Sequence, residues 1–147
     1  MKELFQADTI AVGLKAKNKE QVIDEMVALL NCAGTLRDAA AYKEAIYARE
    51  ELSSTGIGFG IAIPHAKSSA VREARVAVGI SADGIDYSGG SMDKVRLVFM
   101  IAVQATDNDL HLRTLASLSR RLIDPVFRNH LAVCEDPKAV LQLLRAV

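Results

Sequence analysis

The side chains of this sequence best suited to nucleophilic or proton-transfer chemistry at neutral pH are its three histidines. His65 directly follows Pro64, near the end of the glycine-rich segment Ser53 to Lys67. Because the unperturbed pKa of histidine is about 6.5, an accessible imidazole at this position would be mostly neutral and could act as a nucleophile or proton carrier. The alternative is a glycine-rich turn followed by a histidine that only fills space.

The other two histidines differ in their predicted positions. His111 opens a predicted helix after the most apolar strand, whereas His130 lies late in a later helix. In open α/β sheets the crevice beyond the strand ends is the usual functional site. His65 and His111 both fall where the chain leaves a strand, so they could share one crevice, although His111 alone is better explained as a first-turn residue in solvent.

Polar side chains around the start of the glycine-rich segment are candidate ligand-binding groups. Arg49 ends a predicted helix and is either a solvated charge, favourable at a helix C-terminus, or a guanidinium that fixes a phosphate or a carboxylate. The hydroxyls of Ser53, Ser54 and Thr55 could donate hydrogen bonds to the same group, or they could satisfy the backbone of a turn.

Several other kinds of site are not indicated. The glycines follow a G-x-G-x-G pattern that precedes a strand, whereas a dinucleotide-binding fingerprint follows one, and no G-K-[ST] or G-x-S-x-G sequence occurs. A metal site would need further ligands at close spacing, and the sequence offers none. We therefore expect no metal and no cofactor.

Four segments are predicted to be strands: Thr9 to Leu14, Ile61 to Ile63, Ala74 to Ile80 and Val95 to Val103. The last is almost continuously apolar, which is typical of a central strand covered on both faces. Pro64 should end the strand before His65, because proline lacks a backbone donor. Asp83-Gly84 predicts a turn, after which residues 84–87 either pair back or continue the loop, and Gly89-Gly90 predicts a second loop.

Helix starts are predicted from capping residues. Asn18 with Gln21 three residues later indicates a capping box for a helix that Gly34 ends, and a second helix should reach about Glu51. Thr35 is predicted to cap the second helix. One of Asp107, Asn108 and Asp109 is predicted to cap the helix that carries His111. Asp124 and Asp136, each followed by proline, are predicted to cap the last two helices. The predicted buried faces include Val22, Met26, Leu29, Leu30, Leu36, Tyr42, Ala45, Ile46, Leu112, Leu115, Leu122, Val140, Leu143 and Leu144.

Length and composition predict one globular domain, residues 1–147, because half of the residues are hydrophobic and 24% are charged. Helices interleaved with four or five strands predict an α/β sandwich, in which helices flank a central mixed sheet. A net charge of zero without a long Lys/Arg run argues against nucleic-acid or membrane-surface binding. With no apolar stretch of membrane-spanning length and no signal-peptide pattern, we expect a cytoplasmic protein whose two cysteines, Cys32 and Cys134, are reduced and buried.

The glycine-rich segment S-S-T-G-I-G-F-G-I-A-I-P-H-A-K resembles the active-site segment of the fructose/mannitol-type IIA domains of the bacterial phosphoenolpyruvate-dependent sugar phosphotransferase system. The resemblance extends over nearly the whole chain. L-H-L-R-T-L-A-S-L-S-R-R-L-I-D-P-V-F-R resembles the family's second histidine region, V-R-L-V-F-M-I-A-V its central strand, and A-R-E-E-L-S-S-T-G-I-G its arginine-containing segment.

The resemblance implies roles for individual residues. His65 would be the histidine that is phosphorylated, as a tele-phosphohistidine, while His111 assists without accepting phosphate and Arg49 positions the phosphate. Ser54, Thr55 and Gly56 would contribute to substrate binding. Gln104 departs from the family pattern, since relatives often have proline there, and this difference concerns the loop that leads to His111.

The resemblance also implies a function: a phosphocarrier that takes phosphate from the histidine-containing phosphocarrier protein and passes it to a sugar-specific IIB component during uptake of a fructose- or mannitol-like sugar. The alternative is a regulatory nitrogen-type IIA protein whose phosphorylation state controls partner proteins. A third class, a metal-dependent hydrolase, would require a bound metal. Ile57 and Phe59 either form a docking face for partners or are turn residues tucked inward.

Overall fold

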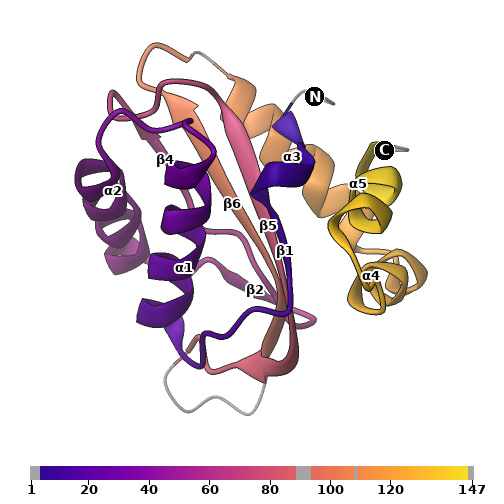
Figure 1. Ribbon diagram of the computed structural model, residues 1–147. Coiled ribbons are helices and arrows are strands. Elements are labelled where there is room, and N and C mark those ends of the chain that lie inside the picture. The colour runs from indigo at the N-terminus through magenta and orange to yellow at the C-terminus, as the bar shows by residue number, and fades with distance from the viewer. Residues whose placement is uncertain (1–3, 89–93, 108, 146–147) are drawn as a thin grey trace.

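The computed structural model describes residues 4–88, 94–107 and 109–145, and it is built on one mixed six-stranded sheet (Figure 1). The strands are β1 (Ile10–Val12), β2 (Gly56–Gly58), β3 (Ile61–Ala62), β4 (His65–Ser68), β5 (Arg75–Ile85) and β6 (Val95–Gln104). Their order is β1-β5-β6-β3-β2, and β4 also pairs with β6. The predicted α/β class is confirmed, with one strand more than the expected maximum of five.

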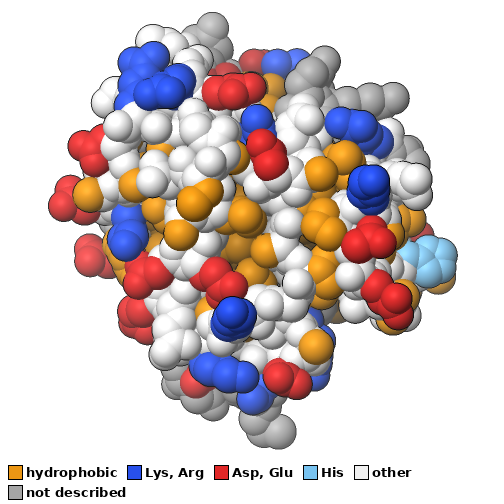
Figure 2. Space-filling model, in the orientation of Figure 1, with side chains coloured by type: hydrophobic (Ala, Val, Ile, Leu, Met, Phe, Trp, Pro, Cys, Tyr) orange, Lys and Arg blue, Asp and Glu red, His pale blue; other side chains and the backbone are white. Residues whose placement is uncertain are grey.

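Helices cover both faces of the sheet, as predicted. The helices are α1 (Lys19–Cys32), α2 (Ala39–Leu52), α3 (Leu110–Leu122), α4 (Pro125–Ala132) and α5 (Pro137–Arg145), preceded by the short 3-10 helix η2 (Ala7–Thr9). Figure 1 shows α1 and α2 on one face of the sheet and α3, α4 and α5 on the other. On the face seen in Figure 2, basic and acidic side chains are interspersed around a more apolar centre.

The strand β6 is central and buried on both faces, which explains its continuous apolar sequence. From Leu97 to Val103, its side chains alternate between two hydrophobic clusters. Those in the cluster with α1 and α2 are Val98, Met100 and Ala102. Those in the cluster with α3, α4 and α5 are Leu97, Phe99, Ile101 and Val103.

Pro64 lies between two short strands, β3 and β4, that each pair with β6. The strand β3 stops at Ala62, but the chain pairs with β6 again from His65 onward, in parallel and with His65 opposite Ile101. The prediction that the strand ends near Pro64 is confirmed. The prediction that His65 lies beyond a strand end is wrong, because His65 is the first residue of β4.

The predicted start of the second helix is also wrong. Thr35 is buried and its hydroxyl donates to the carbonyl of Leu30, so it cannot cap a helix. The helix α2 instead begins after Asp38, whose carboxylate accepts the backbone N–H of Ala41 at 3.1 Å. Both residue types are good N-caps, and only the fold distinguishes them.

Three other predicted caps are confirmed. Asn18 accepts the backbone N–H of Gln21 at 2.9 Å, although the Gln21 side chain accepts from Lys17 rather than completing the box at Asn18. Asp124 and Asp136 each accept a first-turn backbone N–H, at 2.9 and 2.8 Å. A side-chain acceptor followed by proline at the first helical position therefore predicts both later helices correctly.

The predicted turn at Asp83-Gly84 does not reverse the chain. The strand β5 continues through it to Ile85, which pairs with Val95, and the register shifts between Ile80 and Ile85. Gly84 has a φ of 86° and donates its N–H to the Ser81 hydroxyl, so the turn signal marks an irregularity within a strand. The predicted loop at Gly89-Gly90 lies outside the described residues.

Two expectations about burial are wrong. Leu112 is 58% exposed, whereas α3 buries Leu122 as predicted, together with Thr114 and Leu118. Cys32 is exposed and Cys134 is only partly buried, although both are free thiols as predicted. Within the described residues, no helix combines the length and apolar character needed to cross a membrane.

Candidate functional site

A pocket of about 510 Å³ opens where α2, β4 and the start of α3 meet. Its lining consists of Ala45, Ala48, Arg49 and Leu52 from α2, His65, Ala66 and Lys67 from β4, and His111 from α3. The structure thus brings together three side chains that lie far apart in sequence: Arg49, His65 and His111. It does not include His130, which is exposed on α4.

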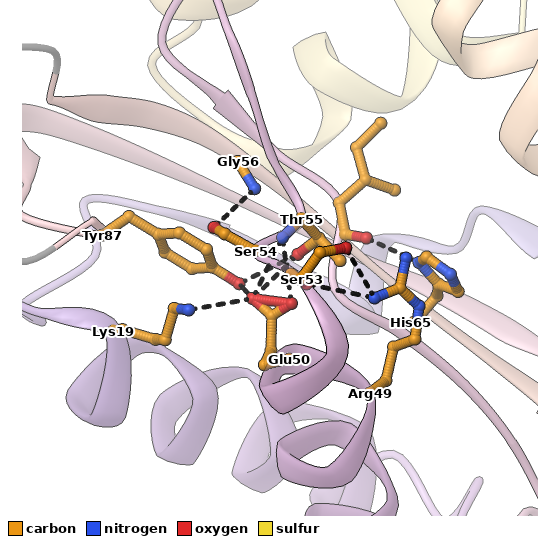
Figure 3. Close-up of polar contacts among 10 residues, drawn as sticks. Lys19, Arg49, Glu50, Ser53, Ser54, Thr55, Gly56, His65 and Tyr87 are labelled. Carbon is orange, nitrogen blue, oxygen red and sulfur yellow. Dashed lines mark hydrogen bonds and ion pairs between the residues drawn. The ribbon is translucent and has the colours of Figure 1, made fainter.

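His65 is partly buried, and one of its ring nitrogens is occupied by the backbone. Its Nδ1 atom lies 2.8 Å from the carbonyl oxygen of Ile63 (Figure 3). Because a carbonyl oxygen only accepts, Nδ1 carries the proton of this hydrogen bond. In the neutral ring the lone pair is then on Nε2, which is the nitrogen available for nucleophilic attack.

His111 is held in a similar way by a carboxylate. Its Nδ1 atom lies 3.2 Å from Oδ2 of Asp107, and its backbone N–H donates to the same oxygen at 3.2 Å. The other carboxylate oxygen accepts the N–H of Leu110 at 3.1 Å. Burial acts to raise the pKa of Asp107, but the hydrogen bonds from His111 and Leu110 outweigh it and lower that pKa.

Arg49 lies in the last turn of α2, and its guanidinium is tied to the chain that follows the helix. Its Nη1 atom donates to the Ser53 carbonyl at 3.1 Å and lies 3.5 Å from the Ser53 hydroxyl. Figure 3 shows the guanidinium on the same side of the helix terminus as the His65 ring. The Ser53 contacts involve a single guanidinium nitrogen, so other donors of the fork remain to bind an anion.

Lys67 is a pocket residue that the sequence analysis missed. It lies two positions after His65 on β4, and residues two apart on a strand point to the same face. The signal existed in the spacing H-A-K, but it could be used only after residues 65–68 were known to form a strand. With Arg49 it gives the pocket two cationic side chains, and none of the described lining residues is acidic.

The predicted substrate-binding residues Ser54, Thr55 and Gly56 are not among the lining residues of this pocket. Thr55 is buried, and its hydroxyl donates to Glu50 at 3.0 Å and contacts the Tyr87 hydroxyl at 3.1 Å. The Ser54 hydroxyl accepts the backbone N–H of Gly56 at 3.2 Å. The structure therefore assigns these groups to the turn backbone and to a buried network behind Arg49 (Figure 3).

Glu50 is the centre of that buried network, which sequence analysis also missed. Only 8% of the residue is exposed, and its carboxylate accepts the Thr55 N–H at 3.0 Å and a hydrogen bond from the Tyr87 hydroxyl. The ammonium of Lys19 on α1 lies 3.5 Å from it. Burial, and then the hydrogen bond to Glu50, raise the pKa of Tyr87. The network fixes the end of α2 and hence the position of Arg49.

Comparison with known proteins connects this geometry to a family. Residues 3–147 match the family described as phosphoenolpyruvate-dependent sugar phosphotransferase system, EIIA 2. The chain belongs to this family. The resemblance seen in the sequence is thereby confirmed.

The EIIA 2 relatives include both longer proteins and solved domains. The chain is 46% identical to the PTS system fructose-specific EIIABC component of Bacillus subtilis, over 97% of this chain and 22% of that protein, so it spans about a fifth of the relative's length. It shares 26% identity and a TM-score of 0.87 with nitrogen regulatory protein IIA-Ntr from Neisseria meningitidis, over 97% of both chains. It shares 27% identity and a TM-score of 0.84 with Escherichia coli enzyme IIAMTL, solved in complex with phosphorylated enzyme IIBMTL, over 97% of this chain and 98% of that one.

Gln104 was noted as a departure from the EIIA 2 pattern, and in the structure it anchors the loop before His111. Its side-chain amide donates to the carbonyl of Arg72 at 2.6 Å, and its own carbonyl accepts the backbone N–H of Asp107 at 3.0 Å. These contacts hold the end of β6 and the residue that contacts the His111 ring.

Two apolar side chains of this EIIA 2 chain lie at the β2–β3 hairpin, and both are exposed. Ile57 is 48% and Phe59 is 74% exposed, so the alternative that they are tucked inward is wrong. The guanidinium carbon of Arg128 lies 4.6 Å from the centre of the Phe59 ring. Across the described ranges, no group of three or more His, Cys, Asp or Glu side chains is arranged to hold a metal.

Proposed function

We propose that this chain is a phosphocarrier of the phosphoenolpyruvate-dependent sugar phosphotransferase system, and that it carries the phosphoryl group on Nε2 of His65. One observation carries the proposal. A backbone-oriented imidazole with an unprotonated Nε2 lines a pocket with two cationic side chains and a second histidine, and without an acidic residue among the described lining. Such a pocket favours a multiply charged anion beside the nucleophile.

The transfer step follows from the assignment of protons on His65. Nε2 attacks the phosphorus of a donor phosphohistidine in line, the donor P–N bond breaks as the new N–P bond forms, and the donor imidazole leaves with the electron pair. His65 keeps its Nδ1 proton throughout, so its ring gains positive character. The Ile63 carbonyl, which accepts that proton's hydrogen bond, stabilises the charge.

The cationic residues act on the phosphoryl oxygens. Negative charge in this transition state is spread over the three equatorial oxygens, and positioned donors and cations lower its energy. Arg49 can bind two of these oxygens through its fork, and Lys67 supplies a point charge from the strand that holds His65. His111 can donate to an oxygen through Nε2. We propose that these residues perform these roles without a metal or cofactor.

The partners are part of the proposal. We propose the histidine-containing phosphocarrier protein as donor and a sugar-specific IIB component as acceptor, with residues 1–147 forming an EIIA type-2 domain that works in the cytoplasm. Support for the acceptor comes from the related Escherichia coli IIAMTL, solved with phosphorylated IIBMTL. The 46% identity to a fructose-specific component supports a fructose-like sugar.

A regulatory nitrogen-type role is the second candidate. The structure of IIA-Ntr superimposes with a TM-score of 0.87, but its sequence identity of 26% is far below the 46% shared with the fructose-specific component. Transfer from the phosphorylated chain to a fructose-type IIB domain distinguishes the two candidates. Rapid transfer supports the transport role, whereas a phosphorylated chain that transfers to none of the sugar-type IIB domains supports the regulatory role.

The central experiment is labelling from radioactive phosphoenolpyruvate in the presence of the two general carrier proteins. The wild type and a His130→Ala control should be labelled equally, because His130 is exposed on α4 and outside the pocket. His65→Ala should take up no label. Undiminished labelling of His65→Ala would overturn the proposed function.

A further inference from the structure

Asp107 contacts the Nδ1 nitrogen of the His111 ring, which leaves Nε2 as the second ring nitrogen. Its Oδ2 atom accepts from the Nδ1 atom and from the backbone N–H of the same residue, each at 3.2 Å. Oδ1 accepts the N–H of Leu110 at 3.1 Å. One carboxylate therefore caps the first turn of α3 and fixes the orientation of the His111 ring. Asp107 itself is held in place through its backbone bond to Gln104.

This contact decides which proton His111 can offer. Because a carboxylate only accepts, the ring proton between the two residues is on Nδ1. His111 can then donate from Nε2 to a phosphoryl oxygen only when the ring carries both protons. A carboxylate in contact with Nδ1 therefore fixes the ring so that Nε2 is the nitrogen left to act on a phosphoryl group.

Charged side chains from several elements lie around His111. The pocket places Arg49 of α2 and Lys67 of β4 on the same cavity as His111, together with the His65 ring. On α3 itself, Arg113 is paired with Asp109 at 3.4 Å. The carboxylate that contacts the His111 ring is itself 13% exposed, so solvent screens it only in part.

We propose that Asp107 is a positioning residue of the phosphoryl relay, which holds the Nδ1 proton of His111 and orients the ring so that Nε2 faces the phosphoryl oxygens. The inference rests on the proposed function for its consequence in catalysis. It does not rest on that function for its effect on the ring, which can be observed in the unphosphorylated protein.

The structure offers a close pair of variants for the test. Asp107→Asn removes the charge but keeps a side-chain oxygen that can accept the first-turn backbone N–H groups of α3. Asp109→Asn removes a charge two residues away, on a side chain that is 65% exposed and pairs with Arg113 instead of His111. Both variants should melt within a few degrees of the wild type, so that differences in the ring or in transfer are not caused by unfolding.

The first measurement is the ring nitrogen chemical shifts of ¹⁵N-histidine-labelled protein at pH 7. Asp107→Asn should mix the two neutral tautomers of His111, because an asparagine amide can donate as well as accept. Asp109→Asn should give wild-type shifts at His111. If Asp107→Asn leaves the His111 shifts unchanged, the inference is wrong, whatever the protein does with phosphate.

The second measurement is the rate of phosphoryl transfer from the labelled chain to a IIB domain. Asp107→Asn should still be labelled on His65 and should transfer about tenfold more slowly, because the His111 ring is no longer held toward the phosphoryl oxygens, while Asp109→Asn stays within about twofold of wild type. Altered ring shifts with an unchanged transfer rate would show that Asp107 orients His111 without serving the relay. Labelling that survives in His65→Ala would instead refute the proposed function and leave the ring measurement standing.

Discussion

The Nδ1 atom of His65 lies 2.8 Å from the carbonyl oxygen of Ile63, two residues earlier in the chain. The contact exists because the chain is interrupted between β3 and β4 at Pro64, which leaves the Ile63 carbonyl directed to the ring that follows. A backbone acceptor cannot titrate or change rotamer, so the interruption fixes both the orientation of the imidazole and the nitrogen that remains reactive.

This relationship predicts the chemical form of the phosphorylated protein. The phosphoryl group should be attached to Nε2, the tele position, because Nδ1 is engaged with Ile63. Multinuclear NMR of the phosphorylated, ¹⁵N-histidine-labelled chain measures which nitrogen couples to phosphorus. Coupling to Nδ1 would mean that the hydrogen bond to Ile63 breaks before transfer, contrary to this prediction.

Replacement of His111 should separate phosphate acceptance from phosphate transfer. His111→Ala leaves Nε2 of His65 in place and should still become labelled, but it lacks the pocket side chain that we propose as a donor. The loss of one positioned donor typically costs about 10²-fold or more in rate. Single-turnover transfer to a IIB domain measures the effect, with His130→Ala as the control. A normal rate in His111→Ala would show that the second histidine is a bystander.

Arg49 is expected to require its guanidinium and not only its charge. Arg49→Lys keeps a cation but loses the two-pronged geometry that matches phosphoryl oxygens, so transfer should fall by about tenfold or more. Because Arg49 also donates to Ser53, thermal melting must be compared in the same samples. Arg120→Lys, on an exposed part of α3, is the matched control. Equal transfer rates for Arg49→Lys and the wild type would remove Arg49 from the phosphate site.

The sequence identified the histidines and Arg49, but not the groups that hold them. His65, His111 and Arg49 are distinguishable because side chains of their types are suited to phosphate chemistry and stand beside strong local signals. Glu50 acts through contacts across the fold that local patterns do not encode. Asp107 was among the candidate helix caps, but its contact with the His111 ring depends on the geometry of the loop. Lys67 was missed for a different reason, since a four-residue edge strand that restarts after Pro64 carries too short a pattern to be recognised.

The predictions of the fold also succeeded where the sequence signal is local and failed where the outcome depends on packing. The central strand β6 and the two Asp-Pro helix starts were predicted correctly because their signals are local and strong. Thr35 was taken for an N-cap because its residue type allows the role, whereas its burial and its bond to Leu30 depend on packing. The pair Asp83-Gly84 is typical of a turn, but pairing between β5 and β6 continues on both sides of these two residues.

Removal of the buried carboxylate behind the pocket should destabilise the chain. Glu50→Ala leaves the Thr55 N–H and the Tyr87 hydroxyl without their shared acceptor, and Lys19 without its counter-ion. Broken networks of this kind cost about 3 kcal/mol of unfolding free energy. Urea denaturation measures the loss. Glu51→Ala, one residue along and exposed, should change the same free energy by less than about 0.5 kcal/mol. Similar values for the two variants would contradict the structural role of the network.

The tyrosines predict how stability depends on alkaline pH. Burial is the main cause that raises the pKa values of Tyr42 and Tyr87, so both stay neutral in the folded chain at pH values where they ionise in the unfolded chain. Their contribution to stability is complete below the unfolded pKa of about 10 and is lost as the pH rises above it. Each such tyrosine should lower the free energy of unfolding by about 1.4 kcal/mol per pH unit above that point.

Phenylalanine variants provide the test of this pH dependence, because they remove the titrating group and keep the ring. Tyr42→Phe loses the hydrogen bond to the Ile101 carbonyl at 3.0 Å and should be less stable at pH 8 by about 1 kcal/mol. Its unfolding free energy should nevertheless fall less steeply than that of the wild type between about pH 10 and pH 11, and Tyr87→Phe should behave alike. Denaturant titrations across this range measure both slopes. Slopes parallel to the wild type would mean that the two hydroxyls ionise equally easily in the folded and unfolded chains, and that their burial does not couple protonation to folding.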